Sequence, residues 1–179
     1  MNKKTIKLKS ADIINIRKEL DAEIIKAWKT IRSENIMSTK EIKANCGSGK
    51  DLKALYNMIT QMQQKRILIK GLLMYLNMGY NEFNYEEFKK TNNYSIFAAC
   101  EAKEAIAQLK MIPTLDPTAK AKQSKKIANK KETFTSAKIA SLLKNLQLEA
   151  NKHDTALETF NNGTEISITG TDLIDNITA

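Results

Sequence analysis

The sequence predicts an all-α protein of long antiparallel amphipathic helices, bundle-like or coiled-coil-like, with a small β-ribbon formed by its two termini. Apolar residues recur at spacings of three and four over most of the chain, and its two prolines lie close together, at 113 and 117. Polar and apolar residues alternate near both ends, which is typical of strands. The length of 179 residues fits one domain better than two.

We expect this single helical domain, 1–179, to be divided by the proline pair. Its expected parts are an N-terminal strand or arm at 1–9, a helical core at 10–111, a Pro-containing break at 112–117, a Lys-rich segment and long helix at 118–162, and a C-terminal strand and tail at 163–179.

The first helix is predicted between Ser10 and Arg32, with Ser10 as a plausible N-cap. One stripe of this helix is apolar and the opposite face is charged. The apolar stripe consists of Ile13, Ile16, Leu20, Ile24, Ala27 and Ile31.

The stretch Gly47-Ser48-Gly49-Lys50 raises the question of a phosphate-binding loop. Such a loop requires Gly at position 44 and Ser or Thr at position 51, where Ala44 and Asp51 stand, and a buried strand before it. Ser48 and Asp51 instead have the spacing of a capping box in front of an apolar periodic segment. We therefore predict a helix start here.

The helix that follows carries a heptad seam, a stripe of residues spaced alternately by three and four. Its members are Leu52, Leu55, Ile59, Met62, Arg66, Ile69, Leu73 and Leu76. Arg66 is the one polar member and is expected to set the register of packing, so that Arg66→Leu should keep or raise stability. Gly71 is expected where another helix crosses closely. The apolar run at 67–80 contains Lys70 and Asn77 and is too short for a membrane span, so we expect a buried helix and no membrane contact.

Residues 80–97 hold six of the chain's aromatic side chains among Asn and Glu. The acidic neighbours favour a satellite core that plugs the end of a bundle over a platform for stacking bases. A capped short helix is expected from Asn84, and an Ala-rich helix from about 95 to 111. Cys100 in that helix is interpreted as a small hydrophobe, because the only His of the chain is far away in sequence at 153.

The last helix is predicted from about Ser136 to Asn161, with a left-handed stop at Asn161-Asn162-Gly163. It carries a second heptad seam, in which His153 is interpreted as a structural residue. The members are Ile139, Leu143, Leu146, Ala150, His153, Leu157 and Phe160.

Two further groups of residues are expected to make contacts. The terminal strands should pair through Ile6, Leu8, Ile166 and Ile168, within one subunit or between neighbours. A basic run, expected as a frayed helix or a linker, should face an anionic partner such as DNA or an acidic protein surface. The run comprises Lys120, Lys122, Lys125, Lys126, Lys130 and Lys131.

No residue pattern predicts a catalytic group, a cofactor or a metal ion. Cys46 and Cys100 are isolated, which favours reduced thiols, and the charged N-terminus is not a secretory signal. We expect a protein of the cytoplasm or of a virion. The formal net charge of +9 comes mostly from Lys, so any DNA binding should be non-specific.

The long heptad helices, the absent catalytic groups and the terminal segments KTIKLKS and TEISITGTD resemble the small helical accessory proteins of tailed-bacteriophage particles. This resemblance implies a non-enzymatic structural or assembly protein whose partners are copies of itself or other structural proteins of a particle. The alternative left open is a non-specific nucleic-acid-binding protein that uses the basic run at 120–131.

Overall fold

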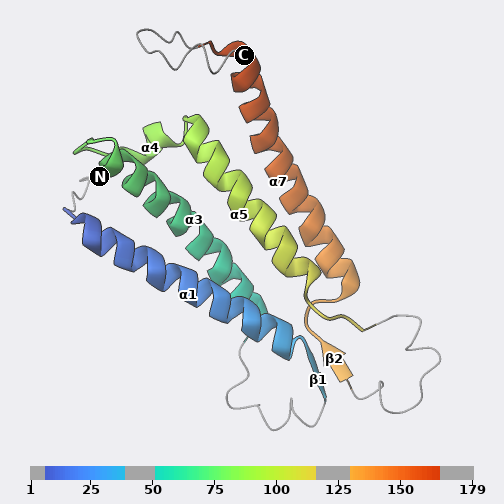
Figure 1. The fold of residues 1–179 in the computed structure, drawn as a ribbon. Coiled ribbons are helices and arrows are strands. Elements are labelled where there is room, and N and C mark those ends of the chain that lie inside the picture. The colour runs from blue at the N-terminus through green and yellow to red at the C-terminus, as the bar shows by residue number, and fades with distance from the viewer. Residues whose placement is uncertain (1–6, 39–50, 116–129, 166–179) are drawn as a thin grey trace, which may run out of the picture.

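The computed structural model describes residues 7–38, 51–115 and 130–165. Four long helices form an antiparallel bundle, and the predicted all-α class with a small β-ribbon is confirmed (Figure 1). The helices are α1 (Ser10–Glu34), α3 (Leu52–Asn77), α5 (Asn92–Lys110) and α7 (Ser136–Gly163), with the single turn α4 (Tyr85–Phe88) between α3 and α5. The strands are β1 (Ile36–Ser38) and β2 (Lys130–Glu132).

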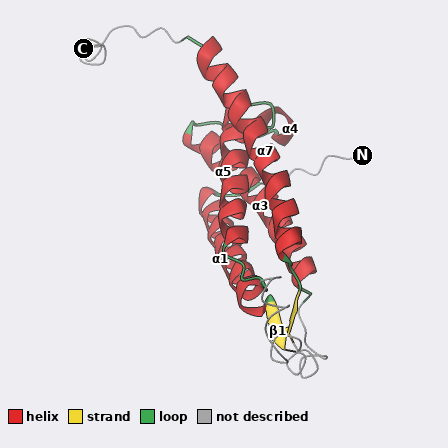
Figure 2. Ribbon diagram, turned by 90° about the vertical axis from the view of Figure 1, so that its right-hand side faces the viewer, coloured by secondary structure: helices red, strands yellow, loops and turns green. Residues whose placement is uncertain are grey.

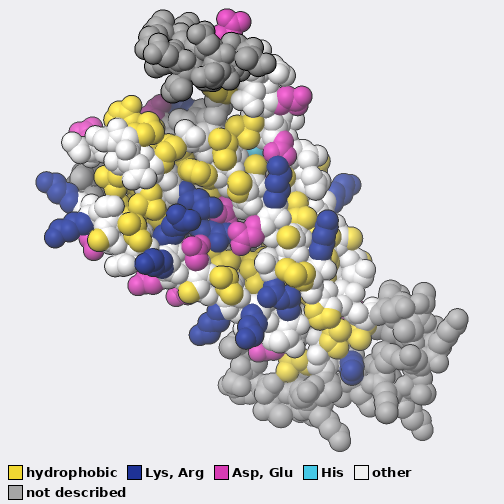
Figure 3. Space-filling view, in the orientation of Figure 1, with side chains coloured by type: hydrophobic (Ala, Val, Ile, Leu, Met, Phe, Trp, Pro, Cys, Tyr) yellow, Lys and Arg dark blue, Asp and Glu magenta, His cyan; other side chains and the backbone are white. Residues whose placement is uncertain are grey.

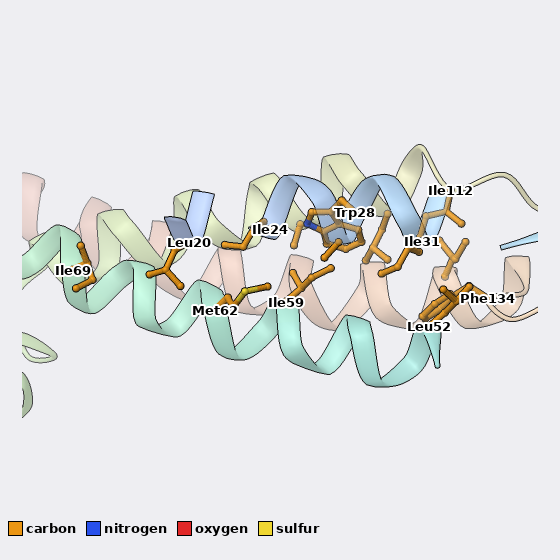
Figure 4. Close-up of a cluster of buried hydrophobic side chains, with 14 of the residues drawn as sticks. Leu20, Ile24, Trp28, Ile31, Leu52, Ile59, Met62, Ile69, Ile112 and Phe134 are labelled. Atoms are coloured by element: carbon orange, nitrogen blue, oxygen red, sulfur yellow. The ribbon is translucent and has the colours of Figure 1, made fainter. Parts of the chain in front are cut away.

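The bundle consists of two helical hairpins. In one hairpin α1 packs along α3, and in the other α5 packs along α7. Apolar stripes of all four helices meet in one core, and Figure 4 shows side chains of α1 and α3 pointing toward each other there. The buried members of this core are Ile13, Leu20, Ile24, Ala27, Trp28, Ile31, Leu52, Ile59, Met62, Ile69, Ala105, Leu109, Ile112, Phe134 and Ile139.

Three helix ends differ from the prediction. The N-cap of α1 is Lys9, and Ser10 is the first residue of that helix. Asp51, not Ser48, caps α3, because its carboxylate accepts from the backbone N–H groups of Lys53 and Ala54. Ser48 lies outside the described residues. The predicted left-handed stop at 161–163 is wrong, since α7 runs through Gly163 without a positive φ. The left-handed residue is Gly79 after α3, with φ 83°, where only glycine avoids steric strain.

The β-ribbon joins the two hairpins. β1 and β2 pair antiparallel with Ile36 opposite Glu132, and they follow α1 and precede α7 (Figure 2). These are not the terminal segments that the sequence indicated. Leu8 lies before α1 and belongs to neither strand. The other three predicted members, Ile6, Ile166 and Ile168, lie outside the described residues.

Asn35 anchors the base of this ribbon. Its side chain is buried, with 1% exposed. The amide Nδ2 donates to the carbonyl oxygens of Pro113, at 2.8 Å, and Phe134, at 3.0 Å. The amide Oδ1 accepts from the backbone N–H of Phe134 at 2.7 Å. One side chain thereby fixes the end of α1 to the segments after α5 and before α7.

The opposite end of the bundle is closed by the predicted aromatic plug. Asn84 caps α4 by accepting from the backbone N–H of Glu86, and the turn places Phe88 in a satellite core. Phe88 is fully buried among Tyr75, Phe83, Tyr85, Tyr94 and Phe97. Gly71 of α3 contacts the Phe88 ring, not a crossing helix as expected.

Candidate functional site

The seam of α3 is covered from within the chain. Leu52, Ile59, Met62 and Ile69 are buried in the main core, and its partly buried members Leu55, Leu73 and Leu76 pack against that core. The partner of this seam is largely α1 of the same chain. The seam from Leu52 to Ile69 is therefore occupied, and it offers no free surface to another molecule.

Arg66, the polar member of that seam, joins three helices. Its guanidinium contacts Glu101 of α5 through both Nε, at 2.8 Å, and Nη2. It also contacts Asp21 of α1, at 3.0 Å, and Glu104 of α5, at 2.5 Å. Lys70 adds a contact of 2.8 Å to Glu101. The expected single register residue is thus the centre of a charge cluster that aligns α1, α3 and α5.

The electrostatics of this cluster favour the charged form of Arg66. Burial withdraws the guanidinium of Arg66 from water, which alone would lower its pKa. Hydrogen bonds to Glu101 and Asp21, and the negative charges of Glu101 and Glu104, outweigh that effect and raise the pKa above its ordinary value. Arg66 and Glu101 are both buried, so each neutralises the other in a place that water does not reach.

Sequence reasoning missed the carboxylates of the cluster. A usable signal existed for Glu101, because it lies three residues after Ala98 and four before Ala105, on the apolar stripe of its helix. A lone acid on such a stripe requires a buried cation, just as a lone Arg requires an acid. Asp21 carried no comparable signal.

The seam of α7 is covered over its first half only. Ile139 and Ala150 are buried, and Leu143 and Leu146 pack against the main core. His153 is half-buried, and its Nδ1 lies 3.3 Å from the hydroxyl of Ser95 on α5. Its ring packs edge-on against Tyr94 at 5.9 Å between centroids. Burial lowers the pKa of His153, so the neutral imidazole is favoured, as a structural residue requires.

Beyond His153 the same seam loses its cover. Figures 1 and 2 show the C-terminal turns of α7 projecting past the other helices. Leu157 is partly exposed there and Phe160 is 44% exposed. Residues 154–165 contain Asp154, Glu158 and Glu165 and no Lys or Arg. The projecting end is therefore an acidic amphipathic helix on a protein whose overall charge is positive.

A groove lies over the C-terminal half of α3, between α1 and α5, and we call it the α3 groove. Its volume is about 550 Å³, within the range of ~300–1,000 Å³ typical of ligand pockets. It is mainly apolar. Residues that line it include Leu73, Met74, Asn77, Ile96, Phe97 and Cys100.

Two cations, Arg17 and Lys70, also line the α3 groove, and no acidic residue of the described chain does. Lys70 is held by Glu101 and lies 6.0 Å from the centre of the Phe97 ring. The side chain of Arg17 is 47% exposed and its contact with Asp21 is long, at 3.8 Å. Arg17 is consequently the cation that an incoming anion meets first. Figure 3 shows basic and acidic side chains interspersed near the middle of this view.

Two predicted features differ in the structure. Cys100, which was interpreted as a small hydrophobe on a packing surface, is exposed at the α3 groove. Lys130 and Lys131 lie in β2, not in a helix or linker, and both are exposed. The remaining lysines of the basic run, Lys120, Lys122, Lys125 and Lys126, lie outside the described residues.

Within the described ranges, no group of three or more His, Cys, Asp and Glu side chains could hold a metal ion. No described helix has both the length and the hydropathy of a membrane span. Comparisons of the chain with models of protein families, with curated proteins and with solved structures found no match.

Proposed function

We propose that the protein is a non-enzymatic assembly protein, which associates with copies of itself or with other structural proteins of a larger particle such as a virion. The observation that supports this best is the projecting end of α7. There Leu157 and Phe160 continue a core seam past the helices that cover its first half. An apolar stripe on a projecting acidic helix is typical of a helix that binds in a groove.

The charged residues support the same proposal. The most prominent charge cluster of the described chain, around Arg66, is turned inward and joins α1, α3 and α5. Its cations and carboxylates neutralise one another, so its role is to hold the helices in register. A bundle that presents a projecting helix and an apolar groove is suited to contact with another protein.

Sedimentation velocity of the full chain tests the proposal. We expect a concentration-dependent shift from monomer to a defined oligomer at about 10 μM, together with a higher melting temperature at higher concentration. A single monomeric species whose melting temperature does not change with concentration would contradict self-association.

A second candidate function is non-specific binding of nucleic acid. The exposed Lys130 and Lys131 of β2 favour it, because they place two cations side by side in the sequence on the ribbon. Lys contacts phosphate as a point charge, so affinity for DNA should fall steeply with salt. Titration of labelled duplex DNA at about 50 mM and about 200 mM salt measures this. No binding at the lower salt would exclude this candidate.

A further inference from the structure

Building on the proposed self-association, we propose that the projecting end of α7 of one copy, residues 154–163, binds in the α3 groove of a second copy. Leu157 and Phe160 enter the apolar part of the groove, and Glu158 pairs with Arg17 at its edge. The α3 groove and the projecting end are then the two halves of one interface.

The apolar surfaces are complementary in kind and in position. Leu157 and Phe160 are three positions apart, so they lie on one side of the helix. In the groove, Leu73 and Met74 of α3 and Phe97 of α5 are only partly buried and offer an apolar surface. Burying an aromatic and an aliphatic side chain together is the usual way that an amphipathic helix binds in a groove.

The charges are complementary as well. Asp154 of the projecting end is already paired with Lys103 of its own chain, at 2.7 Å. Glu158 lies one turn later on the same flank of the helix, and no cation of the described chain pairs with it. In the α3 groove, Arg17 is the cation with the weakest partner. Two copies of a protein with a net charge of +9 repel each other overall. The acidic end of α7 is attracted to a groove lined by cations, so it can approach a second copy there.

The groove that receives the α7 end must belong to a second copy. α7 leaves the bundle along α5 as a continuous helix to Gly163, so its last turns cannot bend back into the groove of their own chain. If each copy inserts its α7 end into the other, the interface is used twice and closes as a symmetric dimer.

Disulfide trapping tests the contact directly, because Cys100 is already in the groove. In a Cys46→Ser background, Phe160→Cys places a thiol on the side of the helix that enters the groove. With oxidised glutathione as the oxidant, a disulfide between the introduced thiol and Cys100 of the second copy is expected to yield a covalent dimer. Leu148→Cys is the matched control, since Leu148 is 61% exposed on α7 but outside the seam. The control protein should not form this dimer, and a mapped disulfide peptide identifies the linked residues.

Charge reversal provides a second, independent test. Arg17→Glu and Glu158→Arg are each expected to weaken self-association about tenfold or more, and the double variant should recover most of the loss. Both side chains are exposed, so the fold should tolerate each change, which circular dichroism verifies.

The two proposals fail separately. If the wild type is monomeric at every concentration measured, the proposed self-association is contradicted, and so is this contact. If the wild type is oligomeric, but the Phe160→Cys variant forms no disulfide with Cys100 and the charge-reversal variants at Arg17 and Glu158 associate as the wild type does, the groove contact is overturned while self-association stands.

Discussion

The guanidinium Nε of Arg66 in α3 donates to a carboxylate oxygen of Glu101 in α5 at 2.8 Å, and both side chains are buried. This pairing reverses the expectation from sequence for Arg66→Leu, because removing the guanidinium leaves the buried Glu101 with only the partly exposed Lys70 as a cationic partner. We expect Arg66→Met to lower the free energy of unfolding by about 3 kcal/mol. Urea unfolding followed by circular dichroism measures it.

The double variant Arg66→Met/Glu101→Met serves as the control for this pair. Because it removes both buried charges together, it should be clearly more stable than Arg66→Met alone. Lys90→Ala, which breaks an exposed pair with Glu87, should change stability by less than about 0.5 kcal/mol. Equal losses for Arg66→Met and Lys90→Ala would contradict the role given to the buried cluster.

Replacing Asn35 should loosen the ribbon end of the bundle. Asn35→Leu keeps the branched shape of the side chain but removes the hydrogen-bond partners of the Pro113 carbonyl and of both backbone groups of Phe134. Buried backbone groups without partners are costly, so we expect a loss of about 3 kcal/mol in unfolding free energy. Asn57→Leu on the exposed face of α3 is the control and should cost no more than about 0.5 kcal/mol. A loss at Asn35 no larger than at Asn57 would show that the amide is not needed.

A methyl group at position 71 should collide with the aromatic plug. The Cβ of Gly71→Ala would lie 2.6 Å from Cε1 of Phe88, whose ring is fully buried and cannot move aside. Alanine favours a helix over glycine by about 1 kcal/mol, but overpacking costs about 1–3 kcal/mol, so we expect net destabilisation. Thermal unfolding measures it, with Gly163→Ala as the control, where nothing lies within 4 Å of the added Cβ.

Shrinking the plug tests the cause of that effect. Phe88→Leu is itself destabilising because it leaves a cavity. Combined with Gly71→Ala, however, the methyl group would fill part of this space, so the two losses should not add. Strict additivity would mean that the collision with Phe88 is not the cause.

His153 should make stability depend on pH. Burial lowers its pKa in the folded protein below the ordinary value of 6.5, so the unfolded chain binds a proton more readily. Stability is then fully present above pH 6.5 and is lost as pH falls through 6.5 toward the lower folded pKa. His153→Gln cannot titrate, and its unfolding free energy should change less with pH over this window.

The difference in unfolding free energy between the wild type and His153→Gln gives the contribution of His153 to the pH dependence. The charged and titratable neighbours Glu149, Lys152 and Asp154 on α7, with Tyr94 and Lys103 on α5, are present in both. Urea unfolding from about pH 7.5 to about pH 5 gives the two curves. Parallel curves would contradict the lowered pKa of His153.

The helices were predictable from sequence because their apolar spacing is regular. The stripe from Leu52 to Leu76 fixed the buried face of α3, and Asn84 fixed the start of α4. Apolar periodicity identifies the buried face of a helix but not the element that covers it. The same pattern was therefore equally consistent with a contact between molecules. In the structure, α1 of the same chain covers most of that face.

The ribbon and the charge partners could not be predicted in the same way. β1 and β2 have three residues each, and Lys130-Lys131-Glu132 shows no alternation that marks a strand. These segments pair because the ends of two hairpins meet. Asp21 joins Arg66 across 45 positions, and such a contact depends on how whole helices pack.

The hydrogen bond between the Asn35 amide and Phe134 closes a loop of 99 positions, the longest separation among the side-chain bonds described above. Contacts so distant in sequence are costly in chain entropy until local structure has formed, so this closure should be a late step of folding. Once made, it ties the hairpins together at the end remote from the α4 turn that also links them. The two halves are then joined at both ends of the bundle, so they cannot swing apart about a single hinge.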